Sequence, residues 1–164
     1  MKTNLVLTGL TGCGKTTLGR QLSKMLNMGF IDTDEDIVEL YGPINHLFEK
    51  GETYFRDIES RRVKILSQHS NTVISTGGGV ILRPSNMEAL KKDGLVFYLT
   101  RPVEEIMATA DPSERPLLKD GVQALARLHR DRKPLYLKYC DHVVQSSDIE
   151  RALSEIIARW NQRS

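Results

Sequence analysis

The sequence predicts an α/β fold in which a five-stranded parallel sheet is flanked by helices. Three observations predict it. Short apolar runs alternate along the chain with longer segments whose apolar residues recur at helical spacing, which is the strand–helix alternation of parallel sheets. The apolar runs are continuous rather than alternating, as in strands that are covered on both faces. The length of 164 residues fits a single domain over residues 1–164.

The expected strands are the five apolar runs, at residues 4–8, 30–32, 72–75, 95–100 and 142–145. The clearest helical segments cover residues 15–26, 52–69 and 148–160, where apolar side chains recur three or four positions apart. In sheets of this kind, ligands bind beyond the carboxyl ends of the strands. We therefore expect the functional residues where these strands end, or on segments that fold over those ends.

Composition and charge exclude several classes of protein. The 23 basic and 21 acidic side chains leave a net charge of +2, which gives no electrostatic case for nucleic acid or an anionic membrane as the main partner. The longest apolar run, residues 95–99, is far shorter than the ~20 residues of a membrane helix. Cys13 and Cys140 form neither a disulfide framework nor a metal-type spacing. We therefore expect a cytoplasmic monomer that acts on small molecules.

The strongest motif lies between the first strand and the first helix, at residues 9–16, and its sequence is GLTGCGKT. It matches G-x-x-x-x-G-K-[ST] in the structural context that this motif requires. Glycines allow successive backbone N–H groups to wrap a phosphate, and the helix N-terminus adds its dipole. A chance match is expected in about 0.5% of chains of this length, so the motif predicts nucleotide binding. The residues expected to hold the nucleotide are Gly12, Cys13, Gly14, Lys15, Thr16 and Thr17.

A magnesium site is expected beside this phosphate loop. The hydroxyl of Thr16 can bind the ion, while Lys15 can reach the β- and γ-phosphates. The strand at residues 30–32 ends in Asp32, which is the best candidate to hold Mg²⁺ directly or through water. We therefore expect Mg²⁺ as the cofactor and ATP as the co-substrate.

Residues 111–121 depart from the strand–helix pattern. They are polar, contain Pro112 and Pro116, and precede a basic helix. Two interpretations remain open, a surface connection or a lid that closes over an active site. A small chain with one phosphate loop and a lid-like segment is typical of a small-molecule kinase.

The chain resembles the shikimate kinases in a set of motifs that keeps the order and near spacing of that family and spans residues 9–136. The set comprises the phosphate loop, Asp32-Thr33-Asp34, Phe55-Arg56-Asp57-Ile58-Glu59, Gly77-Gly78-Gly79, Arg115-Pro116-Leu117-Leu118 and Arg132-Lys133-Pro134-Leu135-Tyr136. The resemblance implies a P-loop kinase fold like that of nucleoside monophosphate kinases, with a substrate-binding segment at residues 33–60 and a lid at 111–121. It also implies transfer of the γ-phosphate of ATP to the 3-hydroxyl of shikimate, in chorismate and aromatic amino-acid synthesis.

The resemblance further implies a role for each matching residue. Asp34 binds the ring hydroxyls and lies near the one that is phosphorylated, and Arg56 and Arg132 clamp the carboxylate. Gly78 and Gly79 approach the substrate through backbone N–H groups. Arg115 closes over the transferring phosphate and the nucleotide. The catalytic residues are therefore expected to be Lys15, Asp34 and Arg115.

The chemistry of these residue types agrees with those roles. Arginine offers a planar fork of donors to a carboxylate. A carboxylate accepts hydrogen bonds from hydroxyls and can take a proton from one of them. Phosphoryl transfer otherwise needs alignment and charge neutralisation more than covalent help.

Each of these residues also has a structural interpretation. Asp34 could cap a helix that begins at Glu35, and Arg56 could form an exposed ion pair with Glu52 or Glu59. The glycines at 77–79 could form only a tight turn. Arg115 and Arg132 could be solvated, the latter on a wet basic helix. Cys13 could be a small filler or a thiol activated by the helix N-terminus and Lys15.

Two other functions remain open at this level. Another small-metabolite kinase of the same fold, such as a gluconate kinase, would also phosphorylate a hydroxy acid but would not need Arg56 and Arg132 in this arrangement. A non-catalytic sensor would bind both ligands without turnover.

The chain departs from the family at two positions. It lacks the arginines that the family places near adenine, since residues 107–110 are Met-Ala-Thr-Ala and residues 146–148 are Ser-Ser-Asp.

Overall fold

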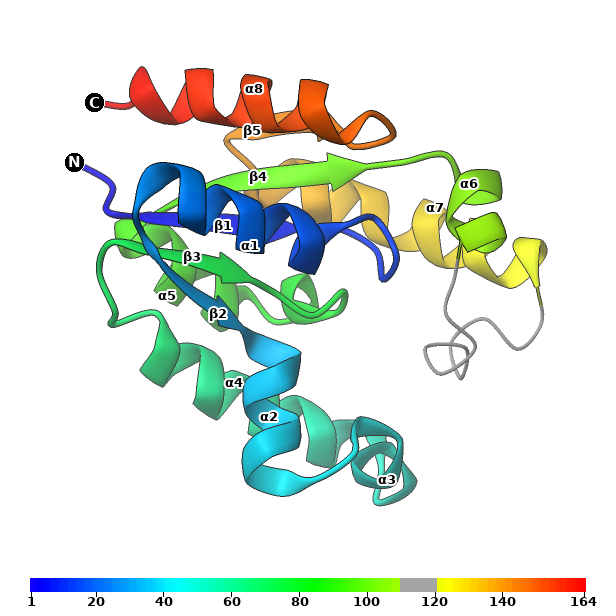
Figure 1. The fold of residues 1–164 in the computed structure, drawn as a ribbon. Coiled ribbons are helices and arrows are strands. Elements are labelled where there is room, and N and C mark those ends of the chain that lie inside the picture. The colour runs from blue at the N-terminus through cyan, green and yellow to red at the C-terminus, as the bar shows by residue number, and fades with distance from the viewer. Residues whose placement is uncertain (110–120) are drawn as a thin grey trace.

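The computed structural model describes residues 1–109 and 121–164, so Arg115 and nearly all of the segment expected as a lid lie outside the described residues. The sheet has five parallel strands in the order β2-β3-β1-β4-β5 (Figure 1). The strands are β1 (Asn4–Thr8), β2 (Gly29–Asp32), β3 (Thr72–Ser75), β4 (Gly94–Thr100) and β5 (His142–Gln145). The predicted sheet is confirmed, with β2 and β4 each beginning one residue earlier than expected.

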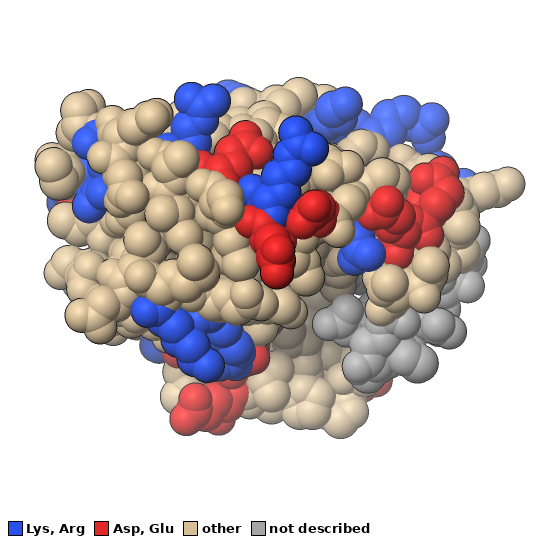
Figure 2. All heavy atoms as spheres, turned by 45° about the horizontal axis from the view of Figure 1, so that its top comes forward, with Lys and Arg blue, Asp and Glu red and all other residues tan. Residues whose placement is uncertain are grey.

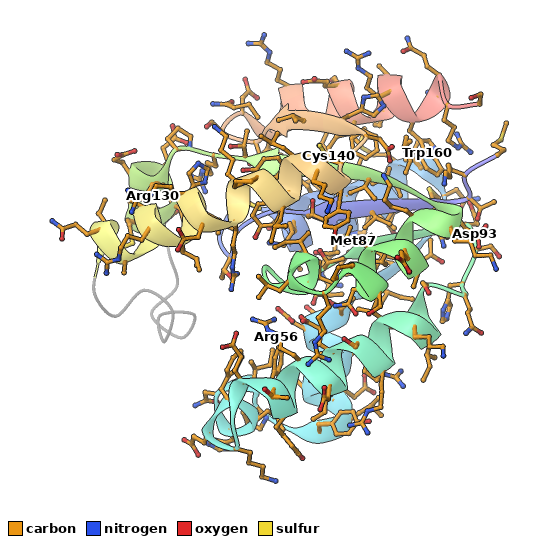
Figure 3. All side chains as sticks on the ribbon, turned by 180° about the vertical axis from the view of Figure 1, so that it is seen from behind. Arg56, Met87, Asp93, Arg130, Cys140 and Trp160 are labelled. Carbon is orange, nitrogen blue, oxygen red and sulfur yellow. The ribbon has the colours of Figure 1, made fainter. Side chains whose placement is uncertain are left out.

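Helices cover both faces of this sheet. On one face lie α1 (Lys15–Leu26) and α8 (Ile149–Asn161), whose apolar side chains pack against β1, β4 and β5. On the other face lie α5 (Pro84–Asp93), α7 (Val122–Tyr139) and the 3-10 turn η1 (Val80–Leu82) (Figures 1 and 3). The short helix α6 (Val103–Thr109) follows β4.

Three helices below the sheet in Figure 1 form a smaller unit. They are α2 (Thr33–Tyr41), α3 (Ile44–Glu49) and α4 (Glu52–Leu66). Their shared core includes Ile37, Leu47 and Ile58. Phe48 on α3 stacks on Phe55 on α4, with 4.5 Å between the ring centroids. This packing fixes the first half of α4 against α2 and α3 and so positions the side chains of α4.

The bounds of two helices differ from the sequence-based expectation for a local reason. The helix expected to reach residue 69 ends at Leu66, because the next amides, of Gln68 and His69, bond to carbonyls three residues back rather than four. The last helix begins at Ile149, because Asp148 stands outside it as its N-cap and accepts from the amide of Arg151. The helix at residues 15–26 has the expected bounds.

Acidic and basic side chains are interspersed over the face drawn in Figure 2. This mixture matches the net charge of only +2. Within residues 1–109 and 121–164, no helix is both long and apolar enough to cross a membrane.

Candidate active site

The phosphate loop, residues 9–16, connects β1 to α1 at the carboxyl end of the central strand. Gly9, Gly12 and Gly14 have φ values of 143°, 85° and 97°, which side chains rarely allow. A Cβ on Gly9 would stand 2.5 Å from the carbonyl oxygen of Leu99. Gly14 is the N-cap of α1 and has no side chain to offer the first amides of the helix. Those amides are therefore available to an anion.

The side chain of Lys15 folds back over this loop and is only 8% exposed. Its Nζ donates to the carbonyl oxygens of Gly9 at 2.6 Å and Leu10 at 2.9 Å. Cys13 is buried in the core between α1 and β4, as expected of a small filler. The hydroxyl of Ser146 donates to the Cys13 carbonyl at 2.6 Å and ties the loop to the end of β5. The loop thus holds one ammonium group at a fixed position above its backbone.

A cleft of roughly 430 Å³ opens over this loop, and we call it the main cleft. Its floor is formed by residues 11–18, and its rim includes Asp32, Asp34 and Gly78. The six loop residues expected to hold the nucleotide, Gly12 to Thr17, all line it, and Arg115, also expected to do so, lies outside the described residues. Its volume and its row of loop amides suit a nucleotide whose phosphates lie on the loop.

Thr16 and Asp32 meet at the edge of the main cleft. The hydroxyl of Thr16 donates to Oδ2 of Asp32 at 2.5 Å. The other carboxylate oxygen, Oδ1, accepts from the amides of Asp34 at 2.9 Å and Glu35 at 3.0 Å. Asp32 is therefore the N-cap of α2, and it keeps one oxygen beside Thr16. Two oxygen groups from different elements at this spacing fit the few protein ligands that Mg²⁺ commonly uses.

The alternative role of Asp34 as a helix cap is wrong. The helix begins at Thr33, one residue before Asp34, and Asp32 fills the cap position. The side chain of Asp34 instead lies against the backbone of Gly77, where an added Cβ would stand 2.6 Å from its Oδ1. Burial and the nearby carboxylates of Asp32 and Glu59 raise the pKa of Asp34 to about 7. This carboxyl can therefore gain or lose a proton near neutral pH.

Arg56 does form intrahelical ion pairs, but it is buried rather than exposed. Its Nη1 donates to Oε1 of Glu59 at 2.8 Å, and its Nε lies 3.6 Å from Glu52. Arg56 is 8% exposed and Glu59 is 1% exposed. Figure 3 shows Arg56 directed from α4 toward the sheet. A Cβ on Gly79 would overlap the guanidinium, so only glycine fits at that position without displacing Arg56.

Arg132 is also buried, so the interpretation as a wet basic helix face is wrong. It lies on α7 and is 7% exposed. A Cβ on Gly78 would stand 3.3 Å from its Nη1. Burial raises the pKa of Glu59, and Arg56 and then Arg132 partly oppose this rise. Arg132 is therefore near enough to Glu59 to favour its charged form, although the hydrogen bond to this buried carboxylate comes from Arg56.

These side chains line a second hollow, which we call the side pocket. Its walls come from α2, α3, α4, α7 and the glycine turn. The residues that line it are Thr11, Asp34, Ile44, Phe48, Phe55, Arg56, Glu59, Gly77, Gly78, Gly79 and Arg132. Three of them, Thr11, Asp34 and Gly78, also line the main cleft. The two hollows are therefore neighbours, and Asp34 stands at their boundary.

Several residues that shape the site were not singled out from the sequence. The hydroxyl of Thr33 accepts from the amide of Gly77 at 3.0 Å and fixes the glycine turn to α2. The hydroxyl of Tyr136 donates to the carbonyl of Gly78 at 2.5 Å. Thr33 precedes Asp34 in the motif at residues 32–34, and Tyr136 ends the motif that begins at Arg132. Ile44 and Phe48 lie in the segment expected to bind the substrate, residues 33–60, but no motif marks them, because their place in the pocket depends on how α3 packs.

Comparison with known proteins places the chain in one family. A family model for "Shikimate kinase" matches residues 11–161. The shikimate kinase of Clostridium botulinum (strain Eklund 17B / Type B) is 45% identical over 158 residues, which are 95% of this chain and 96% of that protein. The shikimate kinase of Clostridium beijerinckii is 39% identical, over 95% of this chain and 94% of that protein.

Solved structures agree with this match. Shikimate kinase from Acinetobacter baumannii in complex with shikimate superposes with a TM-score of 0.91 at 33% identity, covering 100% of this chain and 97% of that chain. Shikimate kinase from Aquifex aeolicus gives a TM-score of 0.84 at 34% identity, covering 96% of each chain. The fold is therefore the expected P-loop kinase fold, and the chain belongs to the shikimate kinase family.

Proposed function

We propose that this chain transfers the γ-phosphate of ATP to the 3-hydroxyl of shikimate, with Asp34 between the two substrates. The observation that supports this most is that the main cleft and the side pocket share Asp34. ATP is assigned to the main cleft and shikimate to the side pocket. Because the hollows adjoin at Asp34, a hydroxyl in one can approach a phosphate in the other, as in-line transfer requires.

Arg56 and Arg132 are proposed to bind the carboxylate of shikimate. Both are buried, and both face the same pocket from different helices. A guanidinium offers a rigid fork of donors, so two of them can hold one carboxylate in a single orientation. Glu59 accepts from Arg56 and keeps it turned toward the pocket. The backbone N–H groups of Gly78 and Gly79 are proposed to complete the contacts with the substrate.

Asp34 is proposed as the general base. Its carboxylate would accept a hydrogen bond from the 3-hydroxyl and take the proton as that oxygen attacks the γ-phosphorus. The bond from that phosphorus to the oxygen bridging it to the β-phosphate breaks, and ADP leaves. A pKa of about 7 suits this task, because the group is partly ionised at neutral pH and basic enough to accept the proton.

The cations at the phosphate end are proposed to neutralise charge. Lys15 would turn from the loop carbonyls to the β- and γ-phosphates, which compete well for an ammonium group. Thr16 and Asp32 would hold Mg²⁺, directly or through water. Mg²⁺ bound there would neutralise the charge of the ATP phosphates. The nucleotide would also contact the backbone at Gly12, Cys13, Gly14 and Thr17.

Arg115 is proposed to close over the transferring phosphate on a lid at residues 111–121. For this residue the support is the sequence motif alone, since it lies outside the described residues. A closed lid would keep water, a competing phosphoryl acceptor, away from ATP. We further propose that the enzyme works as a monomer in the cytoplasm, a reducing compartment that suits its two unpaired cysteines.

The test is ADP release from Mg-ATP with shikimate, with gluconate, or with no acceptor. Lys15→Ala serves as the blank, because it removes a cation assigned to the phosphates. Turnover with shikimate alone is the expected result. Turnover with gluconate would leave the nucleotide site in place but remove the roles of Arg56 and Arg132. Binding of ATP without turnover on any acceptor would favour a sensor and contradict the proposal.

A further inference from the structure

Most backbone polar groups of the glycine turn, residues 77–79, are bound within the protein. The amide of Gly77 donates to the hydroxyl of Thr33 at 3.0 Å. The carbonyls of Gly77 and Gly79 accept from backbone amides of the 3-10 turn η1 that follows. Among the described residues, the amides of Gly78 and Gly79 have no hydrogen-bond acceptor, although both glycines are buried and line the side pocket. Buried amides need a partner, so these two point to a ligand.

The remaining carbonyl of the turn, that of Gly78, is bound by Tyr136. The hydroxyl of Tyr136 donates to it at 2.5 Å. Tyr136 lies on α7, which runs beside η1 (Figure 3). Its side chain is fully buried, and its ring stacks on that of Tyr98 with 4.8 Å between the centroids. Tyr136 is not among the residues that line the side pocket. It therefore contacts the turn from the side away from the pocket.

The hydrogen bond from Tyr136 fixes the orientation of the peptide group between Gly78 and Gly79. In a planar trans peptide, the carbonyl of one residue and the amide of the next point in opposite directions. Because the carbonyl of Gly78 points to Tyr136, the amide of Gly79 points away from it, toward the side pocket. Two adjacent glycines hardly restrict this peptide by themselves. The group that binds the carbonyl therefore decides whether the pocket receives an N–H or a C=O.

We propose that Tyr136 is a positioning residue for the acceptor: its hydroxyl holds the peptide between Gly78 and Gly79 with the N–H toward the side pocket. The inference rests on the proposed function, in which an acceptor with a carboxylate and hydroxyls binds there. A carbonyl in place of this N–H would only accept hydrogen bonds, and so would the carboxylate of the acceptor. Burial raises the pKa of the Tyr136 hydroxyl, which therefore remains a donor at neutral pH.

The test is titration calorimetry of shikimate without nucleotide, in wild type, Tyr136→Phe and Tyr98→Phe. Tyr136→Phe removes one oxygen and keeps the stacked ring. It should weaken shikimate roughly tenfold, and raise the KM for shikimate equally, with kcat and the KM for ATP nearly unchanged. Tyr98→Phe is the matched control, because it removes a buried hydroxyl that has no hydrogen-bond partner among the described residues. It should bind shikimate like wild type. Unchanged ADP binding reports that each variant is folded.

A second comparison separates the glycine turn from Arg132, which lies one helical turn before Tyr136 on α7. In an Arg132→Lys background, Tyr136→Phe should weaken shikimate by the same factor as in the wild type, because the two side chains act through separate contacts. If Tyr136→Phe has no further effect in that background, Tyr136 acts by orienting Arg132, and its assignment to the turn is wrong.

Two results in the single variant would also overturn the inference. Equal binding of shikimate by wild type and Tyr136→Phe would mean that the hydroxyl does not orient the turn. Equal losses of shikimate and ADP binding would mean that it supports the site as a whole. If the wild type binds ADP but not shikimate, the proposed function fails and this inference fails with it. That outcome is distinct, because it appears before any substitution is made.

Discussion

The two ends of the active site are built in different ways. The phosphate end consists of consecutive residues, and most of its donors are backbone amides of one loop and the first turn of α1. The side pocket draws on four helices and a glycine turn, and its charged groups are side chains from those helices. A local motif is therefore enough to form the first, whereas the second exists only when α2, α3, α4 and α7 have packed.

The two ends also differ in how the removal of a buried charge affects stability. At the phosphate end the buried cation Lys15 is held by backbone carbonyls, so its removal leaves no buried carboxylate of the described residues without a hydrogen-bond donor. The side pocket buries Arg56, Glu59 and Arg132 together, and Asp34 lies beside them. Buried charges are tolerated only when they are paired, so removing one strands its partner. Substitutions in the side pocket should thus affect both folding and chemistry, and substitutions at the phosphate end chiefly chemistry.

The largest effect expected is from Asp34→Asn. The amide keeps the shape of the side chain but cannot take up the proton of the attacking hydroxyl. General base catalysis contributes about 10²–10⁴-fold, so kcat should fall by that factor. The Kd of ADP, measured by calorimetry, should stay the same because the phosphate loop is untouched. A loss of kcat smaller than about tenfold would remove Asp34 from the role of base.

The next largest effect is on the free energy of unfolding, and it should differ between substitutions of Arg56 and Arg132. Arg56→Ala leaves Glu59 buried without its hydrogen-bond donor, so the free energy of unfolding should fall by about 3–5 kcal/mol. Arg132→Ala should cost less stability, because Glu59 keeps Arg56. Both substitutions should raise the KM for shikimate, since each removes one of the two arginines proposed to bind its carboxylate. Urea unfolding and steady-state kinetics measure the two quantities.

A double substitution makes this comparison sharper. Arg56→Met with Glu59→Leu removes both charges, and it should recover much of the stability lost in Arg56→Ala while shikimate binding stays weak. If stability is not recovered, the loss in Arg56→Ala comes from packing rather than from the stranded carboxylate of Glu59.

A smaller effect concerns stability and pH. The pKa of Asp34 is raised from 3.8 to about 7 in the folded state, so between these values the folded state binds more protons than the unfolded state. Stability then falls as pH rises through this window, and the loss is complete above about pH 7. Asp34→Asn escapes this loss, so its Tm should exceed that of wild type at pH 8 and match it near pH 4. A gap that is constant with pH would contradict the raised pKa.

The smallest effect expected is from Gly79→Ala. An added methyl group overlaps the end of the Arg56 side chain, which can move away. We expect the KM for shikimate to rise several-fold, by roughly 1 kcal/mol of binding, with the KM for ATP unchanged. Gly42→Ala is a control, because a Cβ there meets nothing within 4 Å, although its φ of 92° makes it a strained site. An equal rise in both KM values would mean that Gly79 supports the whole site.

The phosphate end could be predicted almost completely from the sequence. The loop, its glycines and the bounds of α1 depend on neighbours in the chain, so a local pattern contains the necessary information. The same holds for the five strands, whose apolar runs are short and continuous. The end of α4 was overestimated because residues 67–69 are polar and compatible with a helix, while hydrogen bonding alone decides where it stops.

For the side pocket, only the identities of the residues could be predicted, and not their arrangement. Arg56 and Arg132 were expected from the resemblance to shikimate kinases, but their burial depends on the packing of α4 and α7. The N-cap of α2 is Asp32 rather than Asp34, and both residue positions are compatible with capping.

The most direct test of a shared carboxylate between the two substrates is the pH dependence of kcat/KM for shikimate, measured with saturating Mg-ATP. This ratio reports groups that titrate in the enzyme before shikimate binds. The account predicts a loss of activity below about pH 7, where Asp34 becomes protonated, and no such limb in the residual activity of Asp34→Asn. A wild-type profile that stays flat through pH 7, or a limb that survives in Asp34→Asn, would contradict it.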